Sequence, residues 1–134
     1  MKLCYQAATP DVAIADSVTA YQGTLDQSFG GLSRLGYDGV ELMTLNPGAL
    51  DWKEVKQTAD KYGLNVVLVC TGEIFGQLGL SYTSPVEDNR REAIRRSKEI
   101  IDFASSLGAN INIGRVRGQY CGQLSREETE ELAV

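Results

Sequence analysis

Three segments of the chain share one pattern of hydrophobic and polar positions. In each, an amphipathic stretch ends in glycine, and a short apolar run rich in Val, Ile or Leu follows. Glycine closes the last turn of a helix because it adopts the left-handed conformation at little cost, and such apolar runs are typical of strands. The pattern predicts helix ends at Gly36, Gly63 and Gly108, followed by strands over Gly39 to Met43, Asn65 to Cys70 and Ala109 to Gly114.

Helices are expected between these strands, where apolar residues recur at helical spacing. The motifs DWKE at residue 51, SPVE at residue 84 and SREE at residue 125 are typical of helix starts. The expected helices are Leu25 to Leu35, Trp52 to Tyr62 and Pro85 to Leu107, with a last one opening after Ser125 and reaching Val134. Their expected core residues are Trp52, Val55, Ala59, Tyr62, Ala93, Ile94, Ile100, Ile101, Phe103 and Ala104.

With a first strand over Leu3 to Gln6, strands and helices alternate along the chain. This order implies parallel crossovers, in a barrel or in a doubly wound sheet. No GxGxxG or GxxxxGK[ST] motif follows the first strand, which disfavours the nucleotide-binding open sheets. We therefore expect an α/β fold whose parallel (β/α) units form the N-terminal half of a TIM barrel. The alternative is a flavodoxin-like sheet, with a strand order that reverses about the first strand.

The chain length suits one domain. With 134 residues, 43% of them hydrophobic, we expect residues 1–134 to form a single partial (β/α)₈-barrel domain of about four strands. The last helix has no stop signal, and TIM barrels take ~250 residues. We expect a chain truncated at its C-terminus, with a natural short domain as the alternative. A half-barrel exposes strand edges and a core face, so it is expected to form a homo-oligomer or to associate with its missing half.

Composition excludes several classes of partner. The net charge of −5, from 13 basic and 18 acidic residues, disfavours nucleic acid, and the alternating charges of residues 87–99 are typical of a solvated, salt-bridged helix face. No apolar run approaches the ~20 residues of a membrane helix, and no signal-peptide core follows Met1, so we expect a cytoplasmic protein without a membrane partner.

The cysteines and the missing histidine limit the chemistry. Cys4, Cys70 and Cys121 are odd in number and far apart, which disfavours disulfides and metal clips. The sequence contains no histidine, the commonest acid/base group near neutral pH. Cys70 is therefore expected to pack rather than to act as a nucleophile.

Barrel enzymes carry their chemistry at the carboxyl ends of the strands. Glu41 interrupts an apolar strand and points either into the barrel or into the helix layer; it either orients a substrate or is a structural carboxylate satisfied by arginine or backbone donors. Two arginines in the GRVRG segment could grip a carboxylate or phosphate, or pair with local acids. Glu73 is expected in a lid loop or in solvent. The candidate substrate-binding residues are Gln6, Glu41, Glu73, Arg115 and Arg117.

Four motifs in order along nearly the whole chain resemble the sugar phosphate isomerase/epimerase family of the xylose isomerase-like TIM barrel superfamily. These are LGYDGVEL, DKYGLNV, GLSYTSPVEDNRREAIRRSKEIIDFASSLGA and INIGRVRG. The resemblance implies an enzyme that uses a divalent metal (Mn, Mg, Co or Zn) and two glutamates to move a proton between adjacent carbons of a sugar or sugar phosphate.

The resemblance also divides the barrel. In the epimerase-like members it implies metal ligands at the ends of the fifth to eighth strands, so this chain alone is expected to bind no metal, to hold no catalytic residue and to be inactive. Endonuclease IV, in the same superfamily, has histidine ligands after strands three and four. This chain has Thr71-Gly72 and Arg115-Val116 there, which disfavours that branch. The alternative is a non-catalytic half-barrel that self-associates as a homodimer or a binding module.

Overall fold

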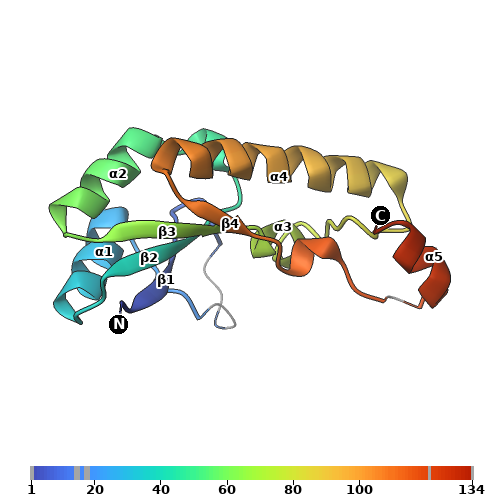
Figure 1. The fold of residues 1–134 in the computed structure, drawn as a ribbon, viewed down its shortest axis with the longest axis horizontal. Coiled ribbons are helices and arrows are strands. Elements are labelled where there is room, and N and C mark those ends of the chain that lie inside the picture. Colours follow the sequence, from blue (N-terminus) through green and yellow to red (C-terminus); the bar gives the residue numbers. More distant parts are fainter. Residues whose placement is uncertain (1, 14–15, 17–18, 121, 134) are drawn as a thin grey trace.

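The structure, a computed structural model, describes residues 2–13, 16, 19–120 and 122–133. Cys121 and Val134, used in the sequence analysis, lie outside the described residues. Four strands form one parallel sheet in the order β1-β2-β3-β4 (Figure 1). This sequential order is that of a partial TIM barrel and excludes the flavodoxin-like alternative. The strands are β1 (Cys4–Ala8), β2 (Gly39–Met43), β3 (Asn65–Cys70) and β4 (Asn110–Asn112).

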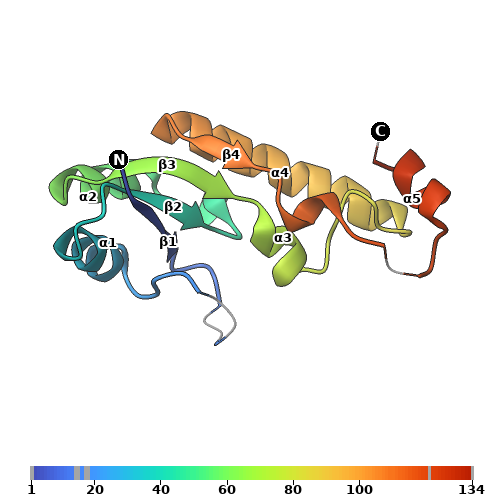
Figure 2. The same cartoon turned by 60° about the horizontal axis from the view of Figure 1, so that its bottom comes forward.

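Helices connect consecutive strands and lie along one side of the sheet (Figure 2). They are α1 (Leu25–Arg34), α2 (Trp52–Lys61) and α4 (Glu87–Leu107), and α5 (Arg126–Glu131) follows β4. Three short elements that the sequence did not predict follow the carboxyl ends of β2, β3 and β4. They are the 3₁₀ turn η1 (Pro47–Ala49), the helix α3 (Gly72–Gly76) and the 3₁₀ turn η2 (Arg115–Arg117).

The repeated glycines have the predicted conformation. Gly36, Gly63 and Gly108 have φ angles of 83°, 66° and 67°, in the left-handed region that closes a helix. The capping box at Ser125 and Glu128 is confirmed, and Thr24 with Gln27 forms a second one that opens α1. The predicted bounds of β2 and β3 are confirmed, whereas β1 begins one residue later and ends two residues later than predicted, and β4 is shorter.

The hydrophobic core lies between the sheet and the helices. Val40, Leu42 and Val69 are fully buried there with Phe29 and Ile100. The core prediction is confirmed for Val55, Ala59, Ala93, Ile100, Phe103 and Ala104, and Tyr62 packs partly buried against them.

Three of the predicted core residues are exposed. Ile94 and Ile101 are 45% and 46% exposed, because each follows a residue of the buried stripe and so lies on a flank of α4 that no other described element covers. Trp52 is 38% exposed because it begins α2, where the ammonium of Lys53 lies 5.7 Å from its ring centre.

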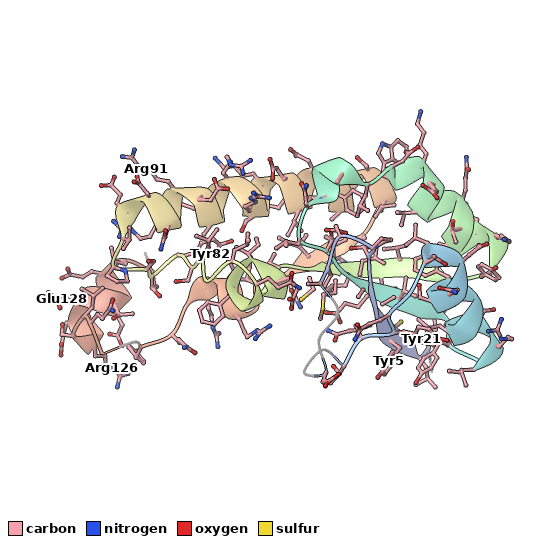
Figure 3. All side chains as sticks on the ribbon, turned by 180° about the vertical axis from the view of Figure 1, so that it is seen from behind. Tyr5, Tyr21, Tyr82, Arg91, Arg126 and Glu128 are labelled. Atoms are coloured by element: carbon pink, nitrogen blue, oxygen red, sulfur yellow. The ribbon has the colours of Figure 1, made fainter. Side chains whose placement is uncertain are left out.

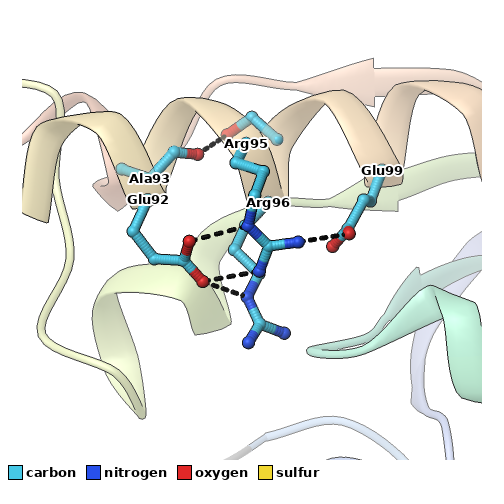
Figure 4. A network of polar contacts seen from close by, with 6 residues as sticks. Glu92, Ala93, Arg95, Arg96 and Glu99 are labelled. Atoms are coloured by element: carbon cyan, nitrogen blue, oxygen red, sulfur yellow. Dashed lines mark hydrogen bonds and ion pairs between the residues drawn. The ribbon is translucent and has the colours of Figure 1, made fainter.

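The outer face of α4 carries an ion-pair network (Figure 4). Glu92 accepts hydrogen bonds from Arg95 and Arg96, and Arg95 also pairs with Glu99. These hydrogen bonds lower the pKa of Glu92 to about 2. The network has the alternating charges of a solvated helix face, as the sequence predicted. No described helix is long and apolar enough to cross a membrane.

The molecule is elongated, and its two ends differ. Tyr5 and Tyr21 lie together at the β1 end, whereas Arg126 and Glu128 of α5 lie at the opposite end (Figure 3). Between them, the hydroxyl of Tyr82 donates to Ser97 Oγ at 2.6 Å, which ties the segment before α4 to that helix. The carboxyl ends of the strands point toward α3 (Figure 1).

Candidate functional site

Glu41 faces the barrel side of the sheet. Its neighbours Val40 and Leu42 are buried on the helix side, so the alternation of a strand turns Glu41 the other way. Gln6 Nε2 on β1 donates to Glu41 Oε1 at 3.0 Å, and Asn112 Nδ2 on β4 donates to the same oxygen at 3.4 Å. Among the described residues, Oε2 has no hydrogen-bond partner, so one carboxylate oxygen is held and the other is free.

The partners of Glu41 differ from those that the sequence suggested. The structural alternative named arginine or backbone donors, but the donors are the side-chain amides of Gln6 and Asn112. Asn112 also accepts from the amide of Thr71 at 3.3 Å. Asn112 was not among the predicted site residues. Its place in the fourth apolar run, polar where isoleucines flank it, was the available signal.

Glu73 is buried, not in a lid loop or in solvent as predicted. It is 3% exposed and lies in the first turn of α3. Arg115 Nη2 donates to its Oε1 at 3.2 Å, and Gln77 Nε2 donates to its Oε2 at 3.0 Å. Gly76 makes this pairing possible, because a Cβ at that position would lie 2.7 Å from Arg115 Nη2. Arg115 therefore pairs with a local acid, one of its two predicted roles.

Two neighbouring hollows bring four of the five candidates to one face. A cavity of about 460 Å³ at the carboxyl ends of the strands is lined by Gln6, Glu73 and Arg115, and a hollow of about 330 Å³ beside it is lined by Gln6 and Glu41. Arg117 is not part of this face. It is exposed and lines a separate hollow with Thr83, Tyr120 and Thr129, near α5.

Cys70 lies at the floor of the larger cavity without the properties of a nucleophile. It is 8% exposed, and its Sγ accepts a hydrogen bond from the amide of Gly72 at 3.3 Å. Burial raises the pKa of its thiol, so the neutral form dominates at neutral pH. This agrees with its expected role in packing.

Asp11 organises the loops beside the cavity, a role that the sequence analysis missed. Its Oδ2 accepts from the amides of Leu45 and Asn46 at 2.8 and 2.7 Å and from Thr44 Oγ1 at 3.0 Å. Burial opposes the ionisation of this carboxyl, but the hydrogen bonds that it accepts, among them those from Asn46, Leu45 and Thr44, outweigh burial and lower its pKa. A carboxylate soon after the end of the first apolar run was the available signal.

The described residues do not form a metal site. They bring together no group of three or more His, Cys, Asp or Glu side chains that could hold a metal ion. One carboxylate oxygen of Glu41 already accepts hydrogen bonds from two side-chain amides, and Glu73 forms an ion pair with Arg115. The chemistry of this face is therefore that of hydrogen bonding and charge balance.

Comparisons with known proteins agree with the observed topology. Residues 30–134 match the sequence profile of the family described as Xylose isomerase-like TIM barrel. A comparison of the sequence with curated proteins found no match.

Among solved structures, the chain is similar to 3-keto-D-glucoside 4-epimerase YcjR from E. coli, with a TM-score of 0.66 and 15% identity over 97% of this chain and 48% of that chain. It is also similar to D-allulose 3-epimerase from Methylomonas sp., with a TM-score of 0.62 and 20% identity over 98% and 44%. A family 2 AP endonuclease from Brucella melitensis gives a TM-score of 0.58 and 18% identity over 96% and 46%. The chain thus spans about half the length of each of these proteins.

Proposed function

The chain belongs to the xylose isomerase-like TIM barrel family, and on that premise we propose that it forms the substrate-facing N-terminal half of a sugar isomerase or epimerase. The reaction of such an enzyme is a proton transfer between adjacent carbons of a sugar. The observation that carries the proposal is the carboxylate of Glu41, which faces the barrel side: Gln6 and Asn112 hold one of its oxygens, and the other has no partner among the described residues.

This arrangement suits recognition of a hydroxyl group. The two amide donors fix the carboxylate plane, so Oε2 is presented at a defined place without a local partner among the described residues. A carboxylate oxygen is a strong acceptor for a sugar O–H. Gln6 lines both hollows, and its amide has a second N–H for a sugar oxygen. These residues bind and orient the sugar in the proposal.

We propose that proton transfer and the divalent metal belong to the other half of the barrel. The described residues of this chain do not fit a metal ion.

We also propose a reducing compartment such as the cytoplasm. The described cysteines, Cys4 and Cys70, are free thiols, which supports this location.

The test is sugar binding by the 134-residue chain, measured by isothermal titration calorimetry with D-allulose. Glu41→Gln replaces the free acceptor oxygen by a donor while Oε1 can still accept from Gln6 and Asn112. The affinity should fall about tenfold, in line with hydrogen bonds to charged groups. Glu54→Gln, the same change on the exposed start of α2, should leave the affinity unchanged.

Two results would contradict the proposal. One is sugar affinity that Glu41→Gln does not alter. The other is isomerase turnover by the pure 134-residue chain that rises as Mn²⁺ or Mg²⁺ is added, because the proposal places the proton-transferring groups outside this half.

A second candidate function is a non-catalytic half-barrel that pairs with a second copy of itself. Exposed apolar side chains at the two edge strands favour it: Leu3 before β1, Tyr5 within β1 and Ile113 after β4. The gene discriminates between the two candidates. Further barrel strands encoded after codon 134 support the enzyme half, and a stop codon there supports the self-pairing protein.

A further inference from the structure

The charge of the larger cavity is already balanced by the chain itself. Among the described residues that line the cavity, Arg115 is the one cation and Glu73 the one anion. The loop over residues 9–20, which borders the cavity through Ala13 and Thr19, contains no Lys or Arg in its sequence and two aspartates. The described lining residues and the sequence of this loop therefore offer no second positive group to an anionic ligand.

Arg115 is committed to Glu73. Its side chain is 62% exposed, whereas that of Glu73 is 4% exposed, and Nη2 lies 3.2 Å from Oε1. A buried carboxylate that loses its cation is strongly destabilised, because water cannot replace the lost partner. A phosphate that bound Nη2 of Arg115 in place of Glu73 would leave the Glu73 carboxylate without its cation. A phosphate that bound the other N–H groups of Arg115 would lie next to the negative charge of Glu73 and be repelled by it. Glu41 adds a further negative charge on the same face.

We propose that Glu73 is a specificity-determining residue, which occupies Arg115 and thereby sets the cavity to accept uncharged sugars and to reject phosphorylated ones. The exposed guanidinium N–H groups still donate to hydroxyl oxygens, which carry no charge to repel. That the ligand is a sugar rests on the proposed function. The charge selection itself does not, because inorganic phosphate is sufficient to test it.

The experiment measures the binding of inorganic phosphate to the 134-residue chain by calorimetry. The wild-type chain should show no saturable binding. Glu73→Gln keeps the size of the side chain but frees the charge of Arg115, so phosphate affinity should rise at least about tenfold, as expected when a charge pair is exchanged between partners. The double variant Glu73→Gln/Arg115→Gln should lose this gain. Glu131→Gln, an exposed change of the same charge on α5, should behave as the wild type.

A second measurement does not depend on whether the Glu73→Gln variant folds. D-Fructose and D-fructose 6-phosphate are compared on the wild-type chain and on Arg115→Gln. The phosphorylated sugar should bind the wild-type chain more weakly than the neutral one, and equal or tighter binding would overturn the inference. Phosphate or phosphorylated-sugar binding by the wild type that Arg115→Gln removes would overturn the inference, and so would a folded Glu73→Gln chain without any gain.

The outcomes separate the inference from the proposed function. Tight, Arg115-dependent binding of D-fructose 6-phosphate overturns the charge selection and leaves a sugar isomerase in place. A gain of phosphate binding in Glu73→Gln, together with no binding of any sugar by the wild type, supports the charge selection and counts against the proposed function.

Discussion

At the scale of single residues, Asp11 accepts three hydrogen bonds on one carboxylate oxygen. Its Oδ2 accepts from two backbone amides and the hydroxyl of Thr44, and its Oδ1 is buried with no hydrogen-bond partner among the described residues. Asp11→Asn removes the charge from these bonds and buries an amide donor with nothing to bind. Because the side chain is partly exposed, we expect a loss of only about 1 kcal/mol at pH 7, measured by urea unfolding.

The pH dependence gives the sign of this contribution. The pKa of Asp11 is lowered from 3.8 in the folded chain, so its stabilisation is complete above that value and is lost as the pH falls below it. The difference in unfolding free energy between the wild type and Asp11→Asn should therefore become smaller below about pH 4. Asp16→Asn, at an exposed position of the same loop, serves as the control. A difference in unfolding free energy that stays constant down to pH 2 would contradict a stabilising role for the ionised Asp11 side chain.

Individual site residues could be predicted from the sequence only in part. Strand alternation leaves two possible directions for the side chain of Glu41, and the burial of Val40 and Leu42 on the helix side shows that it points to the barrel side. Its partner Asn112 is 71 residues away, and only the strand order brings the two together. The burial of Glu73 depends on Arg115, 42 residues on, which no local pattern in CTGEIFG encodes.

At the scale of elements, the three glycines that end α1, α2 and α4 permit a matched test. At Gly36, Gly63 and Gly108, no atom lies within 4 Å of an added Cβ, so replacement by alanine adds strain at positive φ without a clash. Each variant should lose about 1 kcal/mol of folding free energy, measured by thermal or urea unfolding.

The control for this series is Gly48→Ala. Gly48 has no positive φ, and its added Cβ would meet only Asn46 Oδ1 at 3.7 Å. Alanine there should be neutral or slightly stabilising. Equal losses at all four glycines would show that the effect does not come from left-handed backbone.

These same glycines explain why the elements were largely predictable. A glycine before a Val-rich run marks both the end of a helix and the start of a strand, and the bounds of β2 and β3 follow from it. Helix α3 was missed because five residues that begin and end in glycine are too few to show helical periodicity. Ile94 and Ile101 were misplaced because apolar spacing alone does not tell a covered helix flank from an open one.

At the scale of the whole molecule, the two sheet edges are unequal. The backbone of Tyr21 forms hydrogen bonds with the backbone of Gln6 and Ala8 and covers part of the β1 edge. Strand β4 has no strand on its outer side among the described residues, and Ile113 beside it is 51% exposed. Ile94 and Ile101 add apolar surface on α4. An open edge with exposed apolar neighbours favours association.

We therefore expect the 134-residue chain to sediment as a dimer or larger species in analytical ultracentrifugation. Ile113→Lys places a charge beside the open β4 edge, where lysine blocks strand addition, and should weaken association at least about tenfold. Val86→Lys, at a position 52% exposed that precedes α4 at its distant end, should not. A compact monomer for the unmodified chain would contradict both candidate functions, because each leaves the β4 edge to be covered by another half-barrel.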